Sequence, residues 1–272
     1  MVRRANEDAF LVADLSSGAI AVESSVVRFE VGARGALLAV SDGMGGHDAG
    51  EVASSLTLES LLDDLLRDGA QVSPDARVER AVEVANKAVF AAGEARGKKK
   101  RMGATLTALF IQGANAYIAE IGDSRAYILR SGEIRLVTRD QSFVQSLLDA
   151  GGLSPGEAEG HPMRNVLLQA IGQRRDVTVA LGHLALRNRD CLILCTDGLW
   201  GLVGETEIRD VILAAGTLDA ASDRLVALAN ERGGTDNVTV LLAGVAGDVP
   251  EAPRDERISE TFDVLKTFGP VR

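Results

Sequence analysis

The sequence predicts an α+β fold, because strand-like and helix-like segments are grouped along the chain and do not alternate one by one. Short apolar runs separated by Gly-containing turns cluster in the middle of the chain, which is typical of an antiparallel meander. Segments with helical apolar spacing come in pairs, one pair before this cluster and one after it. The chain shows no internal repeat.

The first half of the chain is expected to contain a buried strand, a helix pair and the meander. A continuous apolar run at 36–41 (ALLAVS) ends at Asp-Gly and predicts the buried strand. Helices are expected over 49–66 and 77–95, separated by the Ser73-Pro74 break, because both segments combine good helix formers with helical spacing. The strands of the meander are expected over 105–111, 115–121, 124–130 and 133–138.

The second half begins with a predicted helix over 141–150, followed by a polar, Gly-rich stretch to about residue 164. Two strands, a helix pair and a last strand are then expected over 177–182, 191–196, 205–214, 219–232 and 237–245. The tail beyond Gly247 is polar and holds three of the six prolines, and a short terminal helix is expected over 256–268.

Composition excludes several classes of function. The chain has 272 residues, of which 46% are hydrophobic, so it is long enough for a sizeable core. Its formal net charge of −10 argues against a nucleic-acid-binding face, and the basic run at 98–101 (KKKR) is interpreted as a solvated loop. No apolar stretch approaches the length of a membrane span and the N-terminus lacks a signal-peptide core, so a cytoplasmic protein without membrane association is expected.

The cysteines and histidines indicate neither a disulfide nor a zinc site. Cys191 and Cys195 share one strand-like run, in which their Cα atoms would lie roughly 13 Å apart. A disulfide tolerates at most about 7 Å, so both are expected in the core. The histidines, His47, His161 and His183, are too few and too scattered to form a zinc site.

Five separated segments place an aspartate beside a glycine, a turn or the end of an apolar run. They are 3–8 (RRANED), 41–46 (SDGMGG), 122–125 (GDSR), 196–198 (TDG) and 234–237 (GTDN). A single Asp-Gly pair also marks ordinary turns, so the signal lies in the whole set. Carboxylates gathered from strand ends supply the oxygen ligands that Mg²⁺ and Mn²⁺ require. The set therefore indicates a site for hard divalent cations.

In order and spacing these segments resemble the metal-dependent protein phosphatases, the type 2C serine/threonine phosphatases, in their bacterial form. The match includes Gly103-Ala104-Thr105 and Gly50-Glu51, and it runs from Arg3 to about Val245. The resemblance implies a sandwich of two antiparallel sheets flanked by helix pairs, with the metal centre at one edge between the sheets. It also implies a catalytic domain over 1–246 and a C-terminal tail over 247–272.

The resemblance implies a metal-binding role for seven residues, Glu7, Asp8, Asp42, Gly43, Asp123, Asp197 and Asp236. Asp42 would bridge two Mn²⁺ or Mg²⁺ ions, and the main-chain carbonyl of Gly43 would ligate one of them. Asp197 and Asp236 would complete one ion's shell. Glu7 and Asp8 would act directly or through water, and Asp123 would share a third ion with Asp197.

The implied reaction is hydrolysis of phosphoserine and phosphothreonine in proteins by a metal-bridging hydroxide. Arg3 would clamp the substrate phosphate with its planar fork of donors, although Arg4 competes for that role. The implied partners are phosphorylated substrates of a serine/threonine kinase, and the protein is expected to be a monomer. Two alternatives stay open: a phosphatase of a small phosphorylated metabolite, and a catalytically silent domain that binds a partner through the same fold.

Three features bear on how far the resemblance extends. Animal members often carry histidine directly after the Asp-Gly pair, whereas this chain has Met44, so the proton donor is metal-bound water or His47. Residues 141–161 match the mobile flap of bacterial members, with Asp140, Ser142 and His161-Pro162 in corresponding places. Residues 19–31 alternate in polarity in a segment longer than usual and are expected to add strand pairing.

Overall fold

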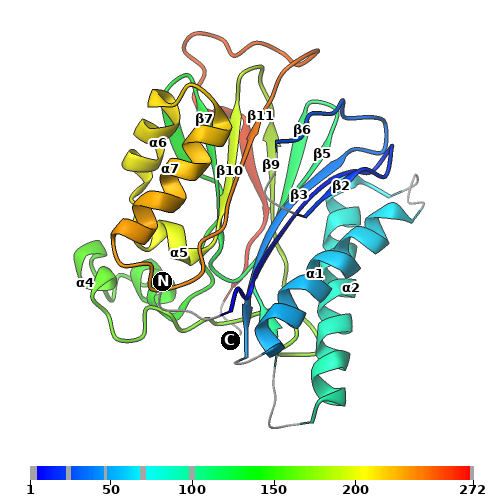
Figure 1. Ribbon diagram of the computed structural model, residues 1–272, viewed down its shortest axis with the longest axis vertical. Coiled ribbons are helices and arrows are strands. Elements are labelled where there is room, and N and C mark those ends of the chain that lie inside the picture. The colour runs from blue at the N-terminus through cyan, green and yellow to red at the C-terminus, as the bar shows by residue number, and fades with distance from the viewer. Residues whose placement is uncertain (1–4, 23–25, 46–47, 68–71, 98–101, 270–272) are drawn as a thin grey trace.

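The protein is a sandwich of two antiparallel sheets, each covered on its outer face by a pair of helices (Figure 1). The computed structural model describes residues 5–22, 26–45, 48–67, 72–97 and 102–269. The eight-stranded sheet contains β1 (Asp8–Asp14), β2 (Ile20–Ala21), β3 (Ala36–Met44), β4 (Gly103–Ala104), β5 (Leu106–Gln112), β6 (Asn115–Ile121), β9 (Ala180–Ala185) and β12 (Phe262–Lys266). The four-stranded sheet contains β7 (Arg125–Arg130), β8 (Glu133–Leu136), β10 (Cys191–Cys195) and β11 (Val240–Gly244). The predicted α+β class and the two antiparallel sheets are confirmed.

The helices form the two outer layers. The pair α1 (Asp48–Leu66) and α2 (Pro74–Ala95) packs on the large sheet, and the pair α6 (Glu205–Ala214) and α7 (Leu218–Glu231) packs on the small one (Figure 1). The shorter helices are α3 (Phe143–Asp149), α4 (Pro155–Glu159), α5 (Asp197–Trp200) and the one-turn 3₁₀ helix η1 (Ile258–Glu260). None of the helices in the described part of the chain is long and apolar enough to cross a membrane.

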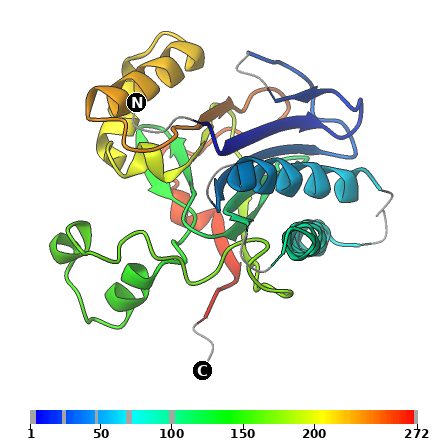
Figure 2. The same cartoon turned by 60° about the horizontal axis from the view of Figure 1, so that its bottom comes forward.

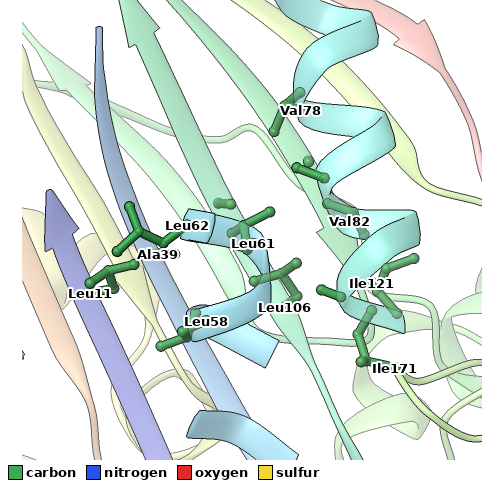
Figure 3. Packing of buried hydrophobic residues seen from close by; sticks show 14 of the residues in the cluster. Leu11, Ala39, Leu58, Leu61, Leu62, Val78, Val82, Leu106, Ile121 and Ile171 are labelled. Carbon is green, nitrogen blue, oxygen red and sulfur yellow. The ribbon is translucent and has the colours of Figure 1, made fainter. Parts of the chain in front are cut away.

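Three apolar clusters hold these four layers together, one at each interface between neighbouring layers. Strand β3 contributes to two of them, because successive side chains of a strand point to opposite faces. Leu37 faces α1 and α2, whereas Leu38 faces the second sheet. Burial on both faces explains why this strand is a continuous apolar run. Figure 3 shows Leu58 and Leu61 of α1 in the cluster that covers the outer face of the large sheet.

Most expected elements lie within a few residues of their observed bounds, but the strand expected over 177–182 begins at Ala180. Thr178 does not pair with a neighbouring strand, because its main-chain N–H and carbonyl are both hydrogen-bonded to the side chain of Gln169. The Thr178 N–H donates to Gln169 Oε1 at 3.2 Å, and Gln169 Nε2 donates to the Thr178 carbonyl at 2.7 Å.

The terminal helix expected over 256–268 is wrong. That segment forms η1 and then β12, which pairs antiparallel with β9 at the edge of the large sheet. Apolar anchoring explains the result, because Ile258 and Phe262 pack into the cluster between the sheets. Charged anchoring contributes too, since Arg130 Nη1 donates to Glu256 Oε2 at 3.0 Å. The tail therefore packs into the sandwich rather than extending from it.

Two further local expectations differ from the structure. Among the described residues of the alternating segment 19–31, Ile20–Ala21 pairs with β1, and residues 26–31 form no strand. The polar stretch after α3 contains α4, which was not expected. The Ser154 hydroxyl and main-chain N–H both donate to the Glu157 carboxylate, at 2.6 and 2.9 Å, which supports the start of this short helix.

Candidate metal centre

Five aspartates from distant parts of the chain lie along one edge of the sandwich, where α5 begins at Asp197. Antiparallel pairing brings this about, because one strand ends where its neighbour begins. Asp8 at the start of β1 lies directly opposite Asp42 near the end of β3. Three more follow or precede strands of the small sheet at the same edge, namely Asp123 before β7, Asp197 after β10 and Asp236 before β11.

The Asp8 carboxylate links the two sheets at this edge. Its Oδ2 accepts hydrogen bonds from Thr196 Oγ1 at 2.8 Å and Thr239 Oγ1 at 2.7 Å. Both threonines belong to the small-sheet side, and the Thr239 N–H in turn donates to Thr196 Oγ1 at 3.1 Å. The Oδ1 atom of Asp8 is buried and accepts no hydrogen bond from an amide, guanidinium or hydroxyl group of the described residues, and the Asp8 carboxyl is in side-chain contact with Asp42. It is therefore oriented and available to ligate a cation.

A second hydroxyl network holds the main chain at Asp42. The Asp42 N–H donates to Thr105 Oγ1 at 2.9 Å, and the Thr105 N–H donates to the Asp42 carbonyl at 2.8 Å. Thr105 Oγ1 also lies 2.7 Å from Ser124 Oγ, and Ser41 Oγ donates to the Thr105 carbonyl at 2.6 Å. Thr105, Ser124 and Ser41 are almost fully buried. Such buried, hydrogen-bonded groups orient neighbouring ligands and restrict their motion.

Close backbone packing beside these aspartates requires glycine. A Cβ on Gly43 would lie 2.0 Å from the Gly50 carbonyl oxygen, and a Cβ on Gly198 would lie 1.9 Å from the Asn237 carbonyl oxygen. The Gly43 N–H donates to the Glu7 carbonyl at 3.0 Å, and the Glu7 N–H donates to Asn237 Oδ1 at 3.0 Å. The chain segments carrying Glu7, Asp42, Asp197 and Asp236 are thus fixed against one another.

The aspartates strongly perturb one another's protonation. Burial, followed by the charges of Asp8, Asp197, Asp236 and Asp123, raises the pKa of Asp42 to about 10. Burial and the charges of Asp197 and Asp140 raise the pKa of Asp123 to about 8. Like charges this close disfavour ionisation unless a cation compensates them. The oxygen-only donor set, the repulsion among the carboxylates and the buried Asp8 Oδ1, which accepts no hydrogen bond from a described N–H or hydroxyl group, all fit hard divalent cations.

These shifts predict how stability depends on pH when the protein is stripped of metal. Because the pKa of Asp42 is about 10 in the folded protein and ordinarily 3.8, the folded state binds more protons between these values. Stability should therefore fall as pH rises through this window. In thermal denaturation with chelator, we expect Tm to be lower at pH 8 than at pH 5 by about 5 °C or more.

Asp42→Asn should reduce that fall, because asparagine does not titrate. Mn²⁺ should raise Tm more at pH 8 than at pH 5, because protons compete with metal for the carboxylates. A Tm that is the same at both pH values in chelator, for both proteins, would contradict the proposed charge repulsion.

The structure describes most, but not all, of the site residues predicted from the sequence. Glu7, Asp8, Asp42, Gly43, Asp123, Asp197 and Asp236 are described, and the aspartates among them interact electrostatically. Arg3 and His47 lie outside the described residues. Within the described ranges, no three His, Cys, Asp or Glu side chains already form a metal-binding group. The individual ligand roles therefore remain predictions.

Sequence reasoning missed the orienting hydroxyls, Thr196, Thr239 and Ser124. Each stands within three residues of an aspartate already singled out, which is the signal that could have found them. What the sequence did not show is that Thr196 and Thr239 serve Asp8, which lies 188 and 231 residues away.

Comparison with known proteins agrees with this arrangement. The family model described as protein phosphatase 2C matches residues 25–229. The chain belongs to the protein phosphatase 2C family. The family resemblance and the enzyme class predicted from the sequence are thereby confirmed.

Individual relatives extend the agreement over most of the chain. This chain is 35% identical to the serine/threonine phosphatase stp of Listeria monocytogenes, over 80% of this chain and 87% of the relative. The crystal structure of the Mycobacterium tuberculosis serine/threonine phosphatase PstP/Ppp superposes with a TM-score of 0.76 at 35% identity, covering 91% of this chain and 95% of that one. The catalytic domain of PstP in complex with two manganese ions gives a TM-score of 0.73 at 33% identity, covering 91% and 94%.

Proposed function

We propose that this protein hydrolyses phosphoserine and phosphothreonine in other proteins, using Mn²⁺ or Mg²⁺ held by the aspartates at the sandwich edge. Its family makes it a metal-dependent serine/threonine protein phosphatase with two such ions. The observation that carries the proposal is the gathering of Asp8, Asp42, Asp123, Asp197 and Asp236 at one edge of the sandwich. A site that gathers this many carboxylates is suited to cations, and it would repel an anionic phosphate without them.

The residues divide into ligands and the groups that hold them. We assign Asp42 and the Gly43 carbonyl to the pair of ions, with Asp197 and Asp236 completing one shell, and Glu7 and Asp8 acting directly or through water. When bound, the ions supply an activated water and neutralise phosphate charge. Thr196 and Thr239 fix the Asp8 carboxylate before substrate arrives, and Thr105 fixes the main chain of Asp42. Asp123 is assigned, with Asp197, to a third ion.

Substrate binding is assigned to Arg3, and leaving-group protonation to His47 or water. Arg3 binds the phosphate through its planar guanidinium fork. Met44 follows the Asp-Gly pair, and its sulfur accepts a hydrogen bond from Gln173 Nε2 at 3.3 Å. A thioether cannot donate a proton, so the acid is His47 or water. The partnership with a serine/threonine kinase and the monomeric state remain predictions.

The substrate class is tested by comparing a phosphothreonine peptide with a panel of phosphorylated metabolites, each with and without Mn²⁺. We expect kcat/KM for the peptide to exceed that for every metabolite by at least about tenfold, because a peptide also contacts the surface around the metals. Preference for a metabolite would identify a small-molecule phosphatase. A folded, Mn²⁺-binding protein that hydrolyses none of them would identify a catalytically silent domain.

A further inference from the structure

The turn that carries Asp123 is held from two sides through its main chain. On one side, Trp200 Nε1 donates to the Asp123 carbonyl at 2.9 Å. On the other side, Gln141 makes two hydrogen bonds to Gly122, its N–H donating to the Gly122 carbonyl at 2.7 Å and its Oε1 accepting from the Gly122 N–H at 3.0 Å. The position of the Asp123 carboxylate therefore depends on Trp200 of α5 and on Gln141 at the start of the flap.

Arg125 connects these two sides. Its guanidinium carbon lies 3.7 Å from the centroid of the Trp200 ring, a close cation–π contact. The same guanidinium forms two hydrogen bonds to Asp140, from Nε to Oδ1 at 2.9 Å and from Nη2 to Oδ2 at 2.8 Å. Both charged side chains are largely buried, where a bidentate pair of this kind gives well-defined geometry. Arg125 thus joins the residue that holds Asp123 to the residue that precedes the flap.

The end of the flap region, at Gln169, contacts Gln141, one of the residues that hold the Asp123 turn. Gln169 Nε2 donates to Gln141 Oε1 at 2.8 Å, and Gln141 Nε2 donates to the Glu120 carbonyl at 3.0 Å. The segment between these two glutamines contains α3 and α4, which extend outward from the sheets (Figure 2). Both ends of this excursion are therefore hydrogen-bonded to the turn that carries Asp123 or to each other.

We infer that Arg125 and Trp200 are positioning residues for Asp123, and that through Asp140 and Gln141 they couple its ion to the flap. The inference rests on the proposed function, in which Asp123 shares a third ion with Asp197. Metal–ligand distances tolerate deviations of only about 0.2 Å, so a turn that is free to shift would lose this ion first. The other two ions have more assigned protein ligands and should be less sensitive.

The test uses two conservative variants and a control on the same strand. Arg125→Lys keeps the charge but removes the two-point contact with Asp140. Trp200→Phe keeps a smaller aromatic ring in place of the indole and removes the Nε1–H donor. The control is Arg130→Lys, because Arg130 also lies on β7 and forms two hydrogen bonds of 2.7 Å to a buried aspartate, Asp190. The number and affinity of bound Mn²⁺ ions are measured by calorimetric titration, with Asp123→Ala as the reference for loss of the weakest ion.

We expect both test variants to weaken the weakest Mn²⁺ site by at least about tenfold and to leave the other sites unchanged. Activity on a phosphothreonine peptide should then require a higher Mn²⁺ concentration and recover at saturation. Arg130→Lys should lower Tm without changing the Mn²⁺ titration, which separates positioning from general stability. If Arg125→Lys does not fold, Trp200→Phe alone decides.

Wild-type-like binding of the weakest Mn²⁺ in Trp200→Phe would overturn the inference while leaving the proposed function intact. A wild-type protein that binds no Mn²⁺ would overturn the proposed function and the inference with it. Loss of the weakest site in Arg130→Lys as well would also overturn the inference, because the effect would then follow from destabilisation of the sheet.

Discussion

Asp42→Ala and Asp236→Ala should each lower kcat on a phosphothreonine peptide by at least about a hundredfold, because each removes a carboxylate assigned to bind metal directly. Asp42 is the stronger case, since its carboxylate lies at the centre of the aspartate cluster. Steady-state kinetics at saturating Mn²⁺ provide the measurement.

Asp223→Ala is the matched control, because Asp223 is an exposed aspartate on α7, and it should behave like wild type. Both site variants should stay folded, since removing a repelling charge from the cluster relieves like-charge repulsion. Reductions of only a few fold in both site variants would show that the ligand assignment is wrong.

Arg3→Ala should chiefly raise KM, because the phosphate is already charged when the substrate binds. Losing a charge-assisted contact in a partly desolvated site costs roughly 2–4 kcal/mol, which lowers kcat/KM by about 30- to 1000-fold. Arg4→Ala is the neighbouring control and should change kcat/KM little. If Arg4→Ala carries the effect and Arg3→Ala does not, the phosphate-binding residue is Arg4.

Much of the fold could be predicted from the sequence, because strong local patterns coincide with burial. The run at 36–41 is apolar on both faces, and β3 is buried on both faces. The helix expected over 205–214 matches α6 in its bounds, since its apolar residues face the small sheet at helical spacing. The aspartate motifs were found for a related reason, because each marks the point where a strand meets a turn.

The elements that were missed depend on contacts distant in sequence. Strand β12 (FDVLK) has no pattern that marks a buried face, because its apolar Val264 and Leu265 are exposed along with the rest of Asp263 to Lys266. It forms because β9 offers an edge and because Ile258 and Arg130 anchor the preceding segment. A local pattern cannot show such an edge. The late start of β9 has a similar cause, since the side chain of Gln169 occupies the main chain of Thr178.

In the candidate site, too, the local motifs could be predicted from the sequence, whereas the contacts between distant segments could not. The sequence predicted which carboxylates gather, because antiparallel topology carries strand ends to one edge. It did not predict how they are held. The threonines that orient Asp8 come from the opposite sheet, and the Trp200 and Gln141 contacts that hold the Asp123 turn come from α5 and the flap. Those contacts depend on how the two sheets and the flap pack, which no single segment specifies.

We propose that metal ions held by the edge aspartates carry out phosphate hydrolysis. The most direct test is the rate of phosphate release from a phosphothreonine peptide, first in excess chelator and then after Mn²⁺ or Mg²⁺ is restored. Hydrolysis should vanish in chelator and return with either ion, and Asp42→Ala should not recover activity. Full activity of the wild-type protein in excess chelator would contradict it.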